Sequence, residues 1–111
     1  MYEMKGIDTV QFCTYFDVME FEWNQQKNQA NYAKHKINFE FARGIFDDPF
    51  VTFRFDQVVD GEERWLAVGK VLELHVLVVV YTCRTRDDQE CIRIISARRA
   101  TSHERRLYEE G

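Results

Sequence analysis

The stretch LHVLVVVYTC, residues 74–83, decides the fold because it is apolar at both its odd and its even positions. A strand with one face in water alternates apolar and polar residues, whereas a strand covered on both faces reads as a continuous apolar run. We therefore expect residues 74–83 to form the central strand of a β-sheet. The run is far shorter than the roughly 18 apolar residues that a membrane-spanning helix needs, so we expect no membrane partner.

Three further runs have the composition of strands, and they lie on both sides of the central one. They are FVTFRF (50–55), RWLAVGKV (64–71) and CIRIISAR (91–98). The segments VVDGEE and TRDDQE between the runs are short and polar, as hairpin connections are. The sequence therefore predicts an antiparallel meander.

Helix signals lie before and after the meander. Asn24 and Asn38 are candidate N-caps for the segments NQQKNQANYAKHK and FEFARGIF, and the sequence DDP ends the second of these. In the first helix we expect one face against the core and one basic, polar face, formed respectively by Ala30, Ala33 and Ile37, and by Lys27, Asn31 and Lys34 or His35. Asp47 and Asp48 precede Pro49, where a turn is a better interpretation than a cation site.

The sequence TSHE at residues 101–104 matches a capping box, so we expect a last helix over residues 102–110. With a strand at EFEW (20–23), the order is strand, two helices, four strands and one helix. This order predicts an α+β domain.

Length and composition indicate one domain. A chain of 111 residues with 45% hydrophobic residues supports one core, which we assign to residues 19–111, with residues 1–18 as an N-terminal extension. Cys13, Cys83 and Cys91 form no CxxC pair and no zinc-like cluster, so we expect reduced thiols and no metal. The N-terminus lacks the pattern of a secretory signal, and a cytoplasmic location is expected.

The chain lacks the GxSxG elbow, the phosphate-binding glycine loop and the HExxH helix. Its distinctive feature is basic: although the formal net charge is −4, five arginines lie between residues 93 and 106. RNA can be cleaved without a metal when a protein supplies a base, an acid and cations that stabilise the charge on phosphorus. The competing interpretation is that most of these side chains are solvated or ion-paired, as Arg64 would be with Glu62 or Glu63.

Arg93 is the arginine that is hardest to explain as a solvated side chain. It lies between Ile92 and Ile94 in a strand, where a charge requires a partner or an open groove. In a regular strand Arg93 and Arg98 point to opposite faces, so they can share a groove only if a bulge or the strand end intervenes. Trp65 or Tyr108 is suited to stacking an unpaired base.

The segments FEWNQQKNQANYAKHKINFEFARGIFDDP, GEERWLAVG, LVVVYT and IRIISARRATSHERRLYEE together resemble the BrnT family of bacterial type II toxins, from about residue 20 to the C-terminus. The resemblance implies a RelE-like fold, in which an antiparallel sheet packs against two N-terminal helices and a C-terminal helix follows. It implies a metal-independent endoribonuclease without a cofactor, which arrests growth. It also implies a BrnA-like antitoxin with a ribbon-helix-helix domain, a heterotetramer of the two, and repression of their operon through operator DNA.

The resemblance also suggests site residues. Phosphate stabilisation falls to Lys27, Arg64 and Arg93 or Arg98, and proton transfer to His35 or Tyr108. Trp23, Asn31 and Ser96 also match the family and are expected to bind substrate; Trp65 and Arg99 are expected to do so from their residue types alone. Partner contacts are expected at His103, Arg105 and Arg106.

One residue departs from the family pattern. Lys36 follows the histidine at a position where the family usually has glycine, so either a left-handed helix cap there is strained or the turn is built differently. The alternative function, from a different class, is a non-catalytic interaction module that acts only as a partner in a DNA-binding repressor complex.

Overall fold

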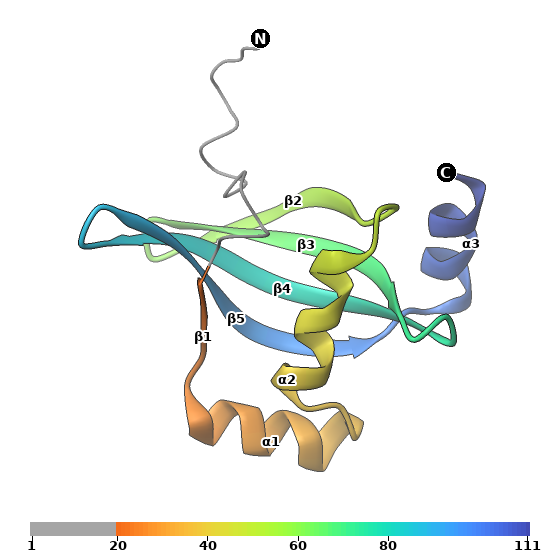
Figure 1. The fold of residues 1–111 in the computed structure, drawn as a ribbon, viewed down its shortest axis with the longest axis horizontal. Helices are drawn as coiled ribbons and strands as arrows, with labels where there is room; N and C mark the ends of the chain where they lie inside the picture. The colour runs from red at the N-terminus through yellow and green to blue at the C-terminus, as the bar shows by residue number, and fades with distance from the viewer. Residues whose placement is uncertain (1–19) are drawn as a thin grey trace, which may run out of the picture.

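The computed structural model of the protein describes residues 20–111, so the predicted extension of residues 1–18 lies outside the described part. The order of elements is the predicted one, and the fold is α+β (Figure 1). The elements are β1 Glu20–Glu22, α1 Gln25–His35, α2 Phe39–Ala42, the 3-10 helix η3 Arg43–Asp47, β2 Thr52–Val59, β3 Glu62–Val71, β4 His75–Arg86, β5 Gln89–Arg99 and α3 Ser102–Glu110.

The five strands form one sheet in the order β1-β5-β4-β3-β2. Strands β2 to β5 are the predicted antiparallel meander, and the apolar run lies in β4 at the centre of the sheet. The expectation of an entirely antiparallel sheet is wrong for β1, which pairs parallel to β5 with Glu22 opposite Arg93. A parallel pair requires a long connection. Here the helices and the rest of the meander supply it.

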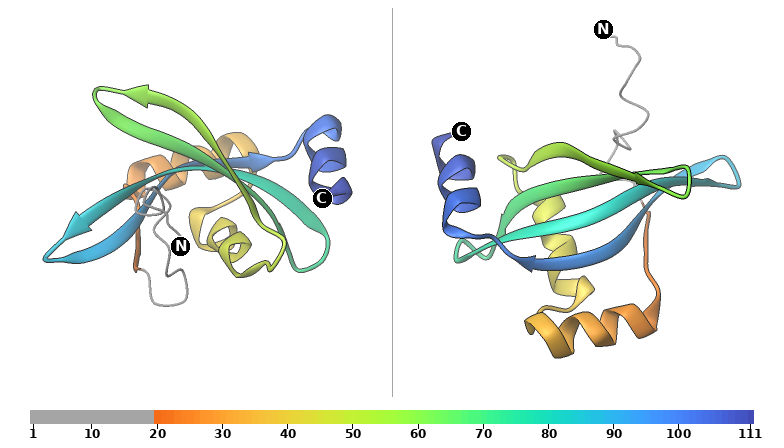
Figure 2. Two further views of the ribbon diagram at one scale, coloured as in Figure 1. Left: turned by 90° about the horizontal axis from the view of Figure 1, so that it is seen from above. Right: turned by 180° about the vertical axis from the view of Figure 1, so that it is seen from behind.

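Helices α2 and η3 cover one face of the sheet, which Figure 2 shows from above. Phe39, Ile45 and Phe46 are buried there against apolar side chains of β3, β4 and β5. The approach is close at Gly69 in β3, where an added Cβ would lie 2.9 Å from Ile45 Cβ and 3.0 Å from the Ile45 carbonyl oxygen. This face is the main core.

Helix α1 lies beside the edge of β5 rather than over the sheet (Figures 1 and 2). The Asn31 side chain donates to the Ala97 carbonyl (2.8 Å) and the Ile37 carbonyl (2.9 Å), and it accepts from the Ala97 N–H (3.2 Å). The Asn31 side chain thus supplies hydrogen bonds to the backbone of the edge of β5, as a neighbouring strand would.

The predicted core face of α1 is wrong for its two alanines, although Ile37, just beyond the helix, is buried as expected. Asn28 and Asn31 are its buried residues, whereas Ala30 and Ala33 are exposed. Buried amides are stable here because each has backbone partners; Asn28 Oδ1 accepts from the Phe39 N–H at 2.8 Å. Hydrogen bonding, rather than apolar area, decides which side of this helix faces inward.

A bulge changes the predicted alternation in β5. Val80 of β4 lies opposite Ser96, but the next residue, Tyr81, lies opposite Ile94, so Ile95 is the extra residue. Ile94 and Ala97 therefore both belong to the main core. As a consequence, Arg93 and Arg98 share the other face of the sheet, which is the exception that the sequence left open.

The helix ends follow their caps. Asn24, Asn38 and Thr101 accept from backbone N–H groups, and Thr101 and Glu104 form the complete capping box. Lys36 adopts the left-handed conformation, with φ 62° and ψ 28°, which is the first of the two alternatives that the sequence left open. A Cβ in this region is unfavourable, so Lys36 is a locally strained residue.

Within residues 20–111, no helix is long and apolar enough to cross a membrane. Cys91 is buried and takes no part in a disulfide, as expected. Cys83 is disulfide-bonded, so the expectation of reduced thiols is wrong for this residue.

Candidate functional site

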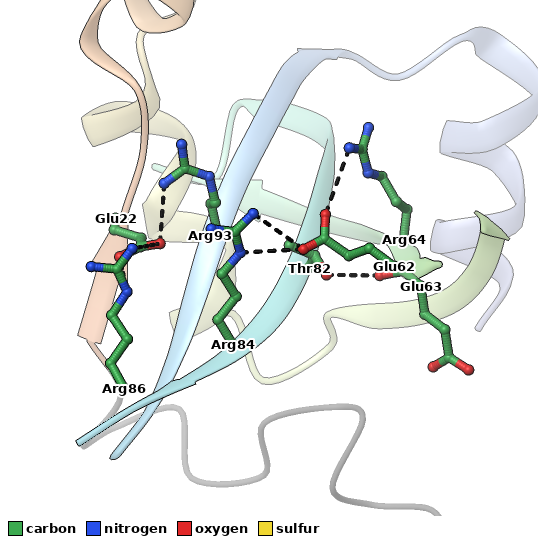
Figure 3. A network of polar contacts seen from close by, with 8 residues as sticks. All are labelled: Glu22, Glu62, Glu63, Arg64, Thr82, Arg84, Arg86 and Arg93. Atoms are coloured by element: carbon green, nitrogen blue, oxygen red, sulfur yellow. Dashed lines mark hydrogen bonds and ion pairs between the residues drawn. The ribbon is translucent and has the colours of Figure 1, made fainter. Parts of the chain in front are cut away.

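Two glutamates, each between two arginines, lie on the face of the sheet opposite α2 and η3 (Figure 3). Glu62 contacts Arg64 at 3.6 Å and Arg84 at 3.2 Å. Glu22 contacts Arg86 at 3.3 Å and Arg93 at 3.1 Å. We name these six residues the arginine face.

The strand register brings these side chains together from four strands. Directly opposed residues of a sheet point to the same face, which places Glu22 with Arg93 and Arg93 with Thr82. The Thr82 hydroxyl donates to the Glu63 carbonyl at 2.8 Å, next to Arg64. Thr82 in the central strand β4 therefore lies between Arg93 on one side and Arg64 on the other.

The arginine face is locally basic. Four guanidinium groups face two carboxylates, a balance of +2 in a chain whose formal net charge is −4. The side chains of Arg64 and Arg93 are only 24% and 25% exposed, so they are held more firmly than Arg86, at 60%. The Nε atom of Arg64 is buried and has no hydrogen-bond partner in the described part of the chain.

The prediction that Arg64 pairs with Glu62 or Glu63 is confirmed for Glu62. Ser96 lies on the same face as Arg93 and Arg98, opposite Val80. Of the predicted site residues, Arg64, Arg93, Ser96 and Arg98 thus share one face.

Arg98 is engaged within the fold. Its guanidinium donates to both carboxylate oxygens of Glu104, at 2.7 and 2.9 Å. The hydrogen bonds from Arg98 are the main cause that lowers the pKa of Glu104 to about 2, against a usual 4.5. Because Glu104 also caps α3, this pair fastens α3 to the end of β5. Arg98 therefore has a structural role. Of the two arginines, Arg93 is the better candidate for binding phosphate.

Tyr108 is also engaged. Its hydroxyl donates to Oδ2 of Asp48, and burial, together with this hydrogen bond, raises the pKa of Tyr108. A raised pKa makes the phenol a weaker proton donor and leaves almost no phenolate that could act as a base. Asp48 also accepts from the N–H groups of Phe50 (2.9 Å) and Lys70 (2.8 Å), so the turn interpretation of this residue fits. Burial raises the pKa of Asp48, but the hydrogen bonds lower it by more, so that the pKa is below its usual value.

The residues predicted on α1 lie elsewhere. Lys27 is exposed in the first turn of α1 and His35 half-buried in the last, along the edge of β5. Asn31, expected to bind substrate, has its side chain buried in hydrogen bonds to Ile37 and Ala97, so that expectation is not supported by its geometry.

The two tryptophans belong to the helix-covered side. Trp23 packs edge-on against Phe39, with ring centroids 6.0 Å apart. Trp65 packs against Phe55 at 5.4 Å and borders the main core, on the face opposite to that of its neighbour Arg64. Neither ring therefore faces the space above Arg64 and Arg93.

The remaining predicted residues lie near the C-terminus. Arg99 is exposed, and its guanidinium lies 3.0 Å from Nδ1 of His75. His103, Arg105 and Arg106 are all exposed on α3.

Sequence reasoning missed Glu22, Arg84 and Arg86, and it named Glu62 only as an ion-pair partner of Arg64. Arg86 was assigned to a hairpin connection and Arg84 to neither strand nor connection, whereas β4 continues through Arg86. The alternation of charged and uncharged residues in CRTR, residues 83–86, is the signal that would have extended the strand. Among the described residues, no group of three or more His, Cys, Asp or Glu side chains is placed to hold a metal ion.

Comparison with known proteins gives two findings. The profile of a family described as "Ribonuclease toxin, BrnT, of type II toxin-antitoxin system" matches residues 23–104. A crystal structure of the Brucella abortus ribonuclease toxin BrnT is similar, with 23% sequence identity and a TM-score of 0.50, over 77% of this chain and 100% of that one. At this identity the second finding concerns the fold alone. No curated protein matches the sequence.

Proposed function

Because the chain belongs to the BrnT family of ribonuclease toxins of type II toxin–antitoxin systems, we propose that it cleaves RNA and that its arginine face binds the RNA backbone. The observation that carries the location is the local charge: four arginines against two glutamates, on a sheet face not covered by α2 and η3. RNA presents a phosphate at every nucleotide, and arginine binds phosphate through paired N–H donors.

The proposed chemistry is attack of the ribose 2′-oxygen on the adjacent phosphorus, with departure of the 5′-oxygen of the next nucleotide. Negative charge grows on the non-bridging oxygens as the bond to phosphorus forms, and preorganised cations lower the energy of that state. Arg64 and Arg93 are our candidates, because they are the least exposed arginines of the face and flank Thr82. Guanidinium groups can supply the charge that a metal ion supplies in other nucleases, so we propose a metal-independent reaction.

The proton acceptor is a separate question. Glu22 and Glu62 lie within ion-pair distance of Arg93 and Arg64, so a phosphate bound there would bring its ribose near a carboxylate. We propose one of these glutamates as the base that accepts the 2′-hydroxyl proton. His35, the earlier candidate, lies along α1, and the Tyr108 hydroxyl is occupied by Asp48.

A type II toxin has an antitoxin partner. We propose a BrnA-like ribbon-helix-helix protein, which would form a heterotetramer with this chain and carry it to operator DNA. The exposed basic side chains of His103, Arg105 and Arg106 on α3 are the proposed contacts. A cytoplasmic location and a RelE-like relationship of the fold belong to the same proposal.

Induced expression in bacteria tests the toxin function. Wild-type protein made alone should stop growth, and coexpression of the antitoxin encoded beside it should restore growth. Arg64→Gln and Arg93→Gln should each reduce the toxicity at equal soluble protein levels, whereas Lys34→Gln, an exposed cation on α1, should not.

One observation favours the second candidate, a non-catalytic partner in a repressor complex. Every arginine of the arginine face already has a glutamate partner within the chain. If soluble wild-type protein leaves growth unaffected yet still binds the antitoxin, this second function replaces the first.

A further inference from the structure

A second basic site lies away from the arginine face, where α1 ends and α2 begins. It is a pocket of about 280 Å³, which we name the Tyr32 pocket. It is lined by Tyr32, Lys36, Ile37, Asn38, Phe41, His75 and Arg99. His75 and Arg99 come from the start of β4 and the end of β5, so the pocket lies at one end of the sheet.

The cations of this pocket differ from those of the arginine face. Arg64, Arg84, Arg86 and Arg93 each contact a glutamate. Among the described residues, no carboxylate lies within 4.0 Å of the charged groups of Arg99 or Lys36. The partner of Arg99 is Nδ1 of His75, at 3.0 Å. Because arginine only donates, this contact requires Nδ1 as an acceptor and leaves the charge of Arg99 unneutralised.

Aromatic rings lie beside these cations. The Tyr32 side chain is 50% exposed, and Lys36 Nζ lies 5.7 Å from the centre of its ring. Phe41 and His75 meet edge-on, with ring centroids 5.8 Å apart. Proteins hold unpaired bases by stacking them on such rings while arginine or lysine binds the adjacent phosphate.

Lys36 adds an independent observation. It holds the left-handed backbone conformation in which glycine is favoured, so the position is strained and yet carries a long cationic side chain at the pocket. Strained residues of this kind cluster at functional sites.

We propose that the Tyr32 pocket binds one unpaired nucleotide of the RNA, with its base stacked on Tyr32 and its phosphate on Arg99 and Lys36. This inference rests on the proposed function, since it adds a second RNA subsite. That subsite lies on the helix-covered side of the sheet, because Arg99 is opposite the core residue Leu77. The volume of the pocket is just below the usual range for ligand sites, which suits one nucleotide rather than a folded RNA element.

The test is equilibrium binding of fluorescent single-stranded 2′-O-methyl oligonucleotides, from a dinucleotide to a decanucleotide, measured by anisotropy over a range of salt concentrations. The 2′-O-methyl group removes the attacking hydroxyl, so binding is separated from cleavage. For the longer oligonucleotides, Tyr32→Ala should raise Kd about fivefold or more, because a stack is lost. Arg99→Gln should also raise Kd and should lower the slope of log K against log salt by about 0.7, the value for one phosphate contact on a single strand.

Lys34→Gln is the matched control, because Lys34 is an exposed cation of the same helix that does not line the pocket. It should change Kd less than twofold. Circular dichroism would confirm that each variant is folded.

The outcomes separate the two proposals. If Arg64→Gln abolishes binding while Arg99→Gln and Tyr32→Ala change neither Kd nor the salt slope at any length, the pocket inference is overturned and the proposed function stands. Wild-type protein that binds no oligonucleotide overturns both. If the pocket variants bind RNA normally but lose affinity for the antitoxin, the pocket belongs to the protein partner, and the nucleotide inference is wrong.

Discussion

Replacing Asn31 distinguishes a structural role from a role in RNA binding. The Asn31 amide makes three buried hydrogen bonds, two to backbone groups of Ala97 in β5 and one to the Ile37 carbonyl. Asn31→Ala removes all three and leaves those backbone groups without partners where α1 covers the edge of the sheet. We therefore expect the variant to be destabilised rather than merely weakened in substrate binding.

The magnitude follows from the three contacts. Each buried group that loses its partner costs about 1–3 kcal/mol, although water reaching a strand edge offsets part of the loss. We expect a decrease of about 3 kcal/mol in the free energy of unfolding, which lowers Tm by about 10 °C or more in a domain of this size. Asn31→Asp should be at least as destabilising at neutral pH, because a carboxylate cannot donate to the Ile37 and Ala97 carbonyls.

Urea unfolding followed by circular dichroism gives the free energies, and Gln29→Ala, an exposed change on the same helix, is the control. The control should change stability by less than about 0.5 kcal/mol. An Asn31→Ala protein as stable as the wild type but deficient in RNA binding would refute the structural assignment and restore the expectation drawn from the sequence.

Three other changes give sharp outcomes. Arg98 lowers the pKa of Glu104 to about 2, so the ion pair stabilises the fold fully above about pH 4.5. This contribution is lost as the pH falls from about 4.5 towards about 2. Glu104→Gln should therefore lower stability at pH 7 by about 1–2 kcal/mol and match the wild type near pH 2 in thermal melts; parallel curves at every pH would exclude this reading. Lys36→Gly should raise stability in urea by about 0.5–1 kcal/mol, because it relieves the left-handed strain, and a decrease would mean that the lysine side chain contributes more than the strain costs. Tyr108→Phe should cost about 1–2 kcal/mol through the lost hydrogen bond to Asp48, with cleavage within twofold of wild type; a large loss of cleavage at unchanged stability would give Tyr108 the proton-transfer role.

The order of elements was predictable because its signals are local. The caps at Asn24, Asn38 and Thr101 and the apolar run of β4 act within a few residues, and all were read correctly. The ends of the strands were not predictable. Polar residues such as Arg84 continue the hydrogen-bonded strand pairing, whereas their composition alone is typical of a turn. The parallel pairing of β1 with β5 depends on contacts between distant segments.

The site was predictable in part. Arg64 and Arg93 share a face as the hypothesis required, but the reason for the position of Arg98 is a bulge that no alternation pattern reveals. The inward face of α1 was misjudged because alanine is apolar, while Asn31 has partners 2.8–3.2 Å away that only the fold supplies. Residue types therefore indicated the chemistry, and tertiary contacts decided which residues remain available for it.

Cleavage of single-stranded RNA by the purified protein in excess EDTA tests the central claim most directly. Products would be resolved on a denaturing gel for wild type, Arg64→Gln, Arg93→Gln and the Lys34→Gln control. The proposed function predicts cleavage by wild type and control, with the rate reduced about 10²-fold or more in each arginine variant, as when a charge-stabilising donor is removed. Equal rates in all four proteins, or no cleavage by folded wild type in EDTA, would contradict metal-independent cleavage at the arginine face.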